Sequence, residues 1–116
     1  MPDCLFKISN NKVNDTLNAA KKTNSVIVFK GNDTVIGTST GQAYININSP
    51  NYLATAGSGD VLAGLIGGFL AQGLSAINSA KLGCYIHSVS AANIGRGLIA
   101  RDLLDEIPTV IKKMTN

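Results

Sequence analysis

The chain has 116 residues, of which 45% are hydrophobic and 15% are charged, so its composition is that of a globular domain and excludes a disordered segment. Its length supports at most one domain with a modest core. The net charge is +3, and the basic residues do not cluster or alternate with aromatic residues, which argues against nucleic-acid binding and suits an anionic small molecule.

The first half of the chain predicts one helix followed by three strands. Residues 13–22 place their apolar side chains on one side and end in two lysines, as expected of a short amphipathic helix. The β-branched run at 26–30 predicts a strand that is buried on both faces. Residues 34–39 and 43–48 predict a hairpin around the turn at 40–42, because apolar and polar side chains alternate along its second strand.

The second half predicts helices. The run at 59–71 has apolar residues at helical spacing but also three internal glycines, Gly64, Gly67 and Gly68. Each internal glycine costs a helix about 1 kcal/mol relative to alanine, so we expect this helix to pack closely against another element there. Ser75 is a suitable N-cap for a long helix at 75–95. A further helical segment is expected at 99–107, with Pro108 starting a last turn.

The order of strands followed by helices predicts one layered α/β unit, without a linker or an internal repeat. The longest apolar run, residues 61–71, is shorter than the ~20 residues that span a membrane, and the N-terminal residues lack the apolar stretch of a secretory signal. Cys4 and Cys84 lie far apart and fit no metal or redox motif. We therefore expect a soluble cytoplasmic protein whose cysteines are free thiols, with Cys84 buried in a helix.

Asp60 is the only charged residue between Tyr52 and Ala80, and it directly follows Gly57-Ser58-Gly59. The stretch is neither a Walker loop nor a dinucleotide fingerprint, since the required lysine and third glycine are missing. On spacing alone, the carboxylate is best explained as a structural group at a helix start. The alternative is functional: the glycines let backbone N–H groups converge on an anion, and Asp60 removes a proton beside it.

The string "NYLATAGSGDVLAGLIGGFLAQG" resembles the signature of the ADP-dependent (S)-NAD(P)H-hydrate dehydratases, which belong to the ribokinase-like superfamily. The preceding "VFKGNDTVIGTSTGQAYIN" and the later "YIHSVSAANIGRGLIARDLLDEIP" are also similar to that family. The resemblance runs from about Val13 to Pro108. It implies a ribokinase-like three-layer αβα fold, of which residues 1–116 form a C-terminal portion: strands and a hairpin, then three helical segments.

The resemblance also implies a reaction and a set of roles. The family dehydrates (S)-NADHX and (S)-NADPHX back to NADH and NADPH, using ADP or ATP as co-substrate, with Mg²⁺ arriving on the nucleotide. Asp60 matches the catalytic base that contacts the hydrated nicotinamide, and Gly57, Ser58 and Gly59 would form the anion hole. Gly59 and a second stretch would bind the nucleotide, namely Lys30, Gly31, Asn32, Asp33 and Thr34. His87 receives no role, and no carboxylate cluster indicates a dedicated metal site.

The match covers only the C-terminal part of the family's domain. A parallel sheet that lacks its other strands would have an open edge and an uncovered apolar face. The resemblance implies a homo-oligomer, as in the family. It also allows a partner chain that supplies the N-terminal half and so completes the domain. Two alternatives remain open: a ribokinase-like kinase acting on a small alcohol, and a non-catalytic nucleotide-binding remnant.

Overall fold

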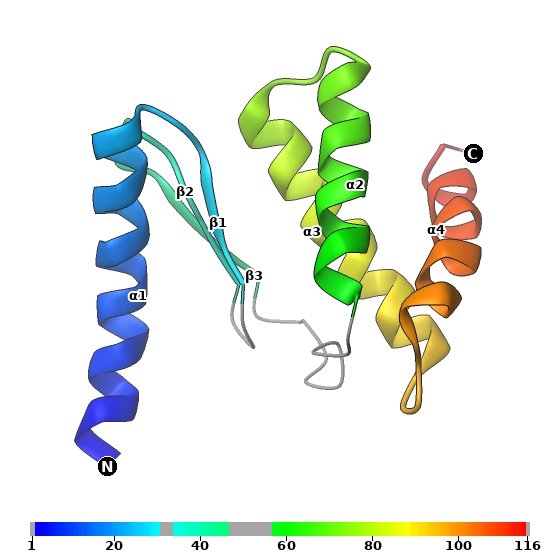
Figure 1. Ribbon diagram of the computed structural model, residues 1–116, viewed down its shortest axis with the longest axis horizontal. Coiled ribbons are helices and arrows are strands. Elements are labelled where there is room, and N and C mark those ends of the chain that lie inside the picture. Colours follow the sequence, from blue (N-terminus) through cyan, green and yellow to red (C-terminus); the bar gives the residue numbers. More distant parts are fainter. Residues whose placement is uncertain (1, 31–33, 47–56, 116) are drawn as a thin grey trace.

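Three layers, a helix, a sheet and a group of helices, make up the computed structural model, which describes residues 2–30, 34–46 and 57–115, with side chains from residue 12 onward (Figure 1). Helix α1 packs against strands β1 and β2 on one face of the sheet, and α3 packs against β2 and β3 on the other. Helices α2 and α4 pack against α3. This arrangement confirms the predicted layered α/β class. The elements run in the order α1 (Pro2–Thr23), β1 (Ile27–Phe29), β2 (Thr34–Gly37), β3 (Ala43–Asn46), α2 (Ser58–Ala71), α3 (Ala76–Ile94) and α4 (Ala100–Met114).

Helix α1 contains the predicted helix at 13–22 but begins earlier, at Pro2. Proline suits a first helical position, where its missing N–H is not needed, and no glycine interrupts the residues that follow. Thr16 and Ala20 are buried against the sheet. The Thr16 hydroxyl donates to the Lys12 carbonyl at 2.6 Å, which satisfies it within the helix. A Cβ on Gly37 would lie 2.8 Å from Thr16 Cγ2, so glycine at this position lets α1 approach β2 closely.

The three strands form an antiparallel sheet in the order β1-β2-β3, which confirms the predicted hairpin of the second and third strands. The predicted burial of the first strand on both faces is wrong. Its Phe29 is 45% exposed, because β1 lies at an edge of this sheet, whereas all four residues of the central strand β2 are buried. Burial on both faces follows from a strand's place in the sheet, and β2 holds that place here.

The two faces of β2 contact different layers. Ile36 packs with Leu62, Ala80 and Cys84 from the helical side. Val35 and Gly37 alternate with Ile36 and therefore face α1. On β3 the polar residues are the more buried ones: Asn46 is half-buried while Ile45 is 51% exposed. The predicted turn at 40–42 is confirmed, with Gly41 at φ +92°.

The long helix predicted from Ser75 is confirmed, and the Ser75 hydroxyl accepts from the Asn78 N–H at 3.2 Å. Helix α4 differs from the prediction, because it runs through Pro108 without ending. Proline there removes one helical hydrogen bond. The buried stripe of Leu103, Ile107 and Val110 continues across it, and this packing keeps the helix intact.

The expectation that the glycines of α2 pack closely is wrong within the described residues. A Cβ added to Gly64, Gly67 or Gly68 would meet nothing within 4 Å. The close approach between α2 and α3 comes instead from Gly83 on α3, where a Cβ would lie 2.6 Å from Ile66 Cγ1. Among the helices that the structure describes, none has both the length and the hydrophobicity needed to cross a membrane.

Candidate functional site

Helix α2 begins without a side-chain cap. Gly57 is the N-cap residue, with a left-handed backbone at φ +86°, and it has no side chain to cap the helix. In a regular α-helix, the first N–H groups do not bond to carbonyls of the same helix. Asp60 is exposed in the first turn and does not occupy the N-cap position. A converging set of backbone donors thus lies beside one exposed carboxylate.

Lys30 brings a positive charge to this helix start. Val28 belongs to the cluster beneath α2 and α3, and Lys30, two residues further along the chain, points to the same side by strand alternation. Its ammonium lies so close to Gly59 that a Cβ on residue 59 would overlap Lys30 Nζ. The strand end and the helix start, which are far apart in the sequence, therefore place a cation beside Gly59 in the first turn of α2.

His87 contacts the same helix start from the buried side. The side chain is 3% exposed, and its Nε2 lies 2.9 Å from the Ser58 carbonyl oxygen. Since that oxygen only accepts, Nε2 carries the proton. Burial lowers the pKa of His87, the hydrogen bond to Ser58 opposes this effect, and the Lys30 charge lowers the pKa further. The ring is therefore neutral at neutral pH.

This contact is the part of the site that sequence reasoning missed. A single histidine in a helical run has no evident partner along the chain, and the sequence assigns it no role. It is packed, but it also holds Ser58. The sequence does hold a signal, because Cys84 and Ala91 lie three residues before and four after His87 and therefore share its side of a helix. The structure shows that this side of α3 is buried.

The turn of α3 that carries His87 is fixed to the sheet. The Asn46 amide donates to Ser88 Oγ at 2.9 Å and to the Cys84 carbonyl at 3.4 Å. Cys84 is buried, as predicted, and burial raises the pKa of its thiol to about 11 although the Lys30 charge lowers it. These contacts hold the turn of α3 that contains His87 against the end of β3.

The remaining predicted site residues fall in two groups. Thr34 is buried at the first position of β2, where it pairs with Asn46. Gly31, Asn32 and Asp33 lie outside the described residues, as does the first part of the signature string, residues 51–56. The structure thus brings together Lys30 and the 57–60 segment, and it leaves the rest of the predicted nucleotide stretch untested.

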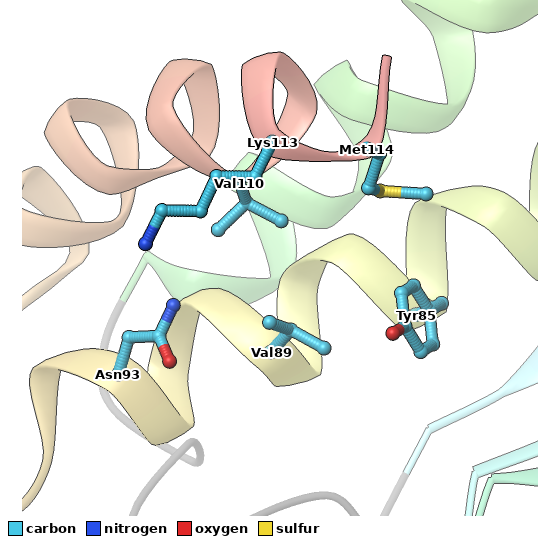
Figure 2. A pocket seen from close by; sticks show the side chains of 6 residues that line it. All are labelled: Tyr85, Val89, Asn93, Val110, Lys113 and Met114. Carbon is cyan, nitrogen blue, oxygen red and sulfur yellow. The ribbon is translucent and has the colours of Figure 1, made fainter. Parts of the chain in front are cut away.

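A hollow lies between α3 and α4, and the residues described above do not line it. Figure 2 shows the six side chains that line it, and its volume is about 190 Å³. None of the predicted site residues is among them. The lining residues are Tyr85, Val89, Asn93, Val110, Lys113 and Met114.

Fold and site together define an α/β protein in which a lysine, an exposed carboxylate and a glycine-initiated helix start converge. The family model for NAD(P)H-hydrate dehydratase matches residues 1–112. The chain belongs to this family.

Individual relatives agree with this assignment. The bifunctional NAD(P)H-hydrate repair enzyme Nnr of Moorella thermoacetica is 37% identical over 113 residues, which cover 93% of this chain and 21% of the relative. The ADP-dependent (S)-NAD(P)H-hydrate dehydratase of Xanthomonas campestris is 33% identical over 100 residues, covering 82% of this chain and 35% of that protein.

The fold is shared with a solved structure of an ADP/ATP-dependent NAD(P)H-hydrate dehydratase from Bacillus subtilis, crystallised with ATP and Mg²⁺ and soaked with CoA. The TM-score is 0.83 at 29% sequence identity, over 91% of this chain and 41% of that one. The chain therefore spans between about a fifth and two fifths of the length of these proteins.

Proposed function

We propose that this chain provides the nucleotide-binding and proton-removing part of a dehydratase that converts (S)-NADHX and (S)-NADPHX to NADH and NADPH at the expense of ADP or ATP. The observation that carries the proposal is the position of Lys30 over Gly59, next to Asp60. A cation and the backbone N–H groups of a helix start attract phosphate oxygens, and a nearby carboxylate accepts a proton. The relatives' activities, with their dependence on ADP or ATP, supply the substrate class.

In the first step, the hydroxyl of the hydrated nicotinamide ring attacks the terminal phosphorus of the nucleotide. Asp60 takes the hydroxyl proton as the new O–P bond forms. The bond from phosphorus to the bridging oxygen breaks, and its electron pair leaves with the shortened nucleotide. Lys30 and the N–H groups of residues 58–60 stabilise the negative charge on the transferring phosphoryl group, which is an effect of fixed donors placed before the reaction.

In the second step, phosphate leaves the ring with the electron pair of the C–O bond. The departing phosphate takes a proton from the neighbouring carbon, and the C–H electrons restore the ring double bond. The anion hole of Gly57, Ser58 and Gly59 holds the departing phosphate. The net change is loss of water from the substrate, coupled to hydrolysis of one phosphoanhydride bond.

Mg²⁺ fits this site as a partner of the nucleotide. It prefers hard oxygen ligands and keeps several waters, and nucleotide phosphates supply such oxygens. When bound, it neutralises phosphate charge. The chain's own contributions are the Lys30 ammonium and the donors at the start of α2, while Asp60 remains available for the proton.

The proposal extends to the cellular setting and to assembly. A free buried thiol at Cys84 suits the reducing cytoplasm, where we place the protein. Because the chain spans only part of its relatives' length, we propose that further polypeptide, from a partner chain or a longer form, completes the domain, and that the assembly is a homo-oligomer as in the family.

Binding is tested first, on the chain itself. Thermal unfolding with Mg-ADP at a hundred times its dissociation constant should raise the unfolding free energy by about 2.7 kcal/mol. Lys30→Met should reduce this effect. Lys22→Met is the matched control, because it removes the same charge from an exposed position in the last turn of α1. Equal losses in the two variants would contradict the assigned site.

Turnover is tested next, on the chain with its completing polypeptide. The recovery of NADH absorbance from NADHX and ATP reports the reaction. Asp60→Asn should abolish it while retaining nucleotide affinity, since the amide accepts no proton but adds no charge near the phosphates. Phosphorylation of a small alcohol without NADH recovery would favour the kinase alternative, and nucleotide binding without either reaction would favour the non-catalytic remnant.

A further inference from the structure

We propose that His87 is a positioning residue of this site, which sets the direction and the donor strength of the Gly59 N–H by holding the other end of the same peptide unit. The role in nucleotide binding rests on the function proposed above. The contact itself is the hydrogen bond from Nε2 to the Ser58 carbonyl, at 2.9 Å.

The 58–59 peptide unit explains how the buried His87 can affect the Gly59 N–H. The Ser58 carbonyl and the Gly59 N–H belong to one planar trans unit and point in opposite directions. When His87 fixes the carbonyl oxygen on the buried side, the N–H is fixed on the other side. Lys30 Nζ lies beside Gly59, so the N–H that His87 restrains belongs to the residue next to the proposed anion site.

His87 adds a restraint to this peptide unit. The Ser58 carbonyl lies in the first turn of α2, where the regular helical bond also uses it. Ser58 stands between two glycines, Gly57 and Gly59, and Gly57 adopts the left-handed backbone that glycine favours. Because glycine neighbours permit a wider range of backbone angles than other residues, the hydrogen bond from His87 narrows the orientation of this unit. His87 is itself held, because it is 3% exposed and the Asn46–Ser88 hydrogen bond anchors the adjacent residue of α3.

The same hydrogen bond strengthens the donor. A carbonyl that accepts a proton is polarised, and the N–H of its peptide unit becomes a better donor in return. The histidine does this without adding charge, since burial and the Lys30 cation keep the ring neutral by lowering the pKa of His87. Lys30 therefore remains the cation over the anion site, and His87 acts through geometry and polarisation.

Two substitutions separate the hydrogen bond from the packing. In His87→Gln, the amide nitrogen reaches the place of Nε2 and still donates. In His87→Leu, the volume is similar but no donor remains. A lost hydrogen bond of ordinary strength weakens binding about 3- to 10-fold. We expect this loss of Mg-ADP affinity in His87→Leu and affinity within about 2-fold of the unsubstituted chain in His87→Gln, a rescue that a purely structural role would not produce.

A second readout does not depend on nucleotide binding. The amide resonance of Gly59 in the nucleotide-free chain should shift, and its hydrogen exchange should quicken, in His87→Leu but not in His87→Gln. If this pattern appears while Mg-ADP fails to bind even the unsubstituted chain, the positioning of Gly59 stands and the proposed function fails. An unchanged Gly59 amide in His87→Leu would overturn the positioning role.

A third measurement needs no variant and covers the case in which His87→Leu does not fold. In the chain labelled with ¹⁵N-histidine, the imidazole should carry its proton on Nε2 at neutral pH. A proton on Nδ1 alone would rule out donation to Ser58 and would overturn the proposal.

Discussion

The contact between α2 and α3 can be tested by adding one methyl group at Gly83. A Cβ on this residue would lie 2.6 Å from Ile66 Cγ1 and 3.6 Å from the Ile66 backbone nitrogen. Ordinary contact begins near 3.4 Å, so the Ile66 side chain must shift by roughly 1 Å. Because Cγ1 is close to the backbone and the backbone itself is in contact, a simple rotation does not release the strain.

The expected magnitude follows from two opposing effects. Overpacking a well-packed contact costs about 1–3 kcal/mol. Replacing a helical glycine by alanine returns up to about 1 kcal/mol. Gly83→Ala should therefore lower the unfolding free energy by about 1 kcal/mol, within a range of about 0–2 kcal/mol. Urea unfolding, compared at equal slope, measures this difference.

The matched control lies on the facing helix. Gly67 is exposed and a Cβ there would meet nothing within 4 Å, so Gly67→Ala should gain up to about 1 kcal/mol. The two substitutions are chemically identical and should have opposite signs. Combining Gly83→Ala with Ile66→Ala, which removes Cγ1, should reduce the penalty and reveal coupling between the two positions. If Gly83→Ala were as stabilising as Gly67→Ala, the packing of α2 on α3 described above would be incorrect.

Three further predictions concern burial and protonation. Leu103→Ala should lower the unfolding free energy, measured in urea, by about 2–5 kcal/mol, because Leu103 is 0% exposed. Leu104→Ala, at a position that is 59% exposed, should change it by no more than about 0.5 kcal/mol. Equal losses would contradict the orientation of α4. In a Cys4→Ser background at pH 8, the Cys84 thiol should react with iodoacetamide about 100-fold more slowly in the folded chain than in the urea-unfolded chain. The reason is that burial raises the pKa of Cys84 from 9.0 to about 11 and so lowers the fraction of thiolate. Rapid alkylation of the folded chain would argue against this burial. Finally, burial lowers the pKa of His87 in the folded chain below the ordinary 6.5, so as the pH falls the unfolded state binds a proton at His87 before the folded state does. This group should leave the unfolding free energy unchanged above pH 6.5 and lower it as the pH drops further. His87→Gln should remove that component of the pH dependence.

Local signals in the sequence determined much of the fold. Ser75 caps α3 as predicted because capping involves residues three positions apart. The boundaries of α2 follow from Gly57 and Gly73, whose positive φ values glycine adopts without steric cost. The signature string also led to the correct family, since its residues are contiguous.

Only the tertiary structure decided which faces are buried and which side chains meet. The β-branched run at 26–30 indicates a strand, but its edge position depends on its pairing with β2. The helix α4 continues through Pro108 because a distant core stabilises it, against local propensity. The contact of His87 with Ser58 joins residues 29 positions apart, and the approach of Lys30 to Gly59 depends on the same packing of α2 and α3 on the sheet. Periodicity specifies which side chains share a face of one element, whereas the partner of that face is set by how the elements pack together.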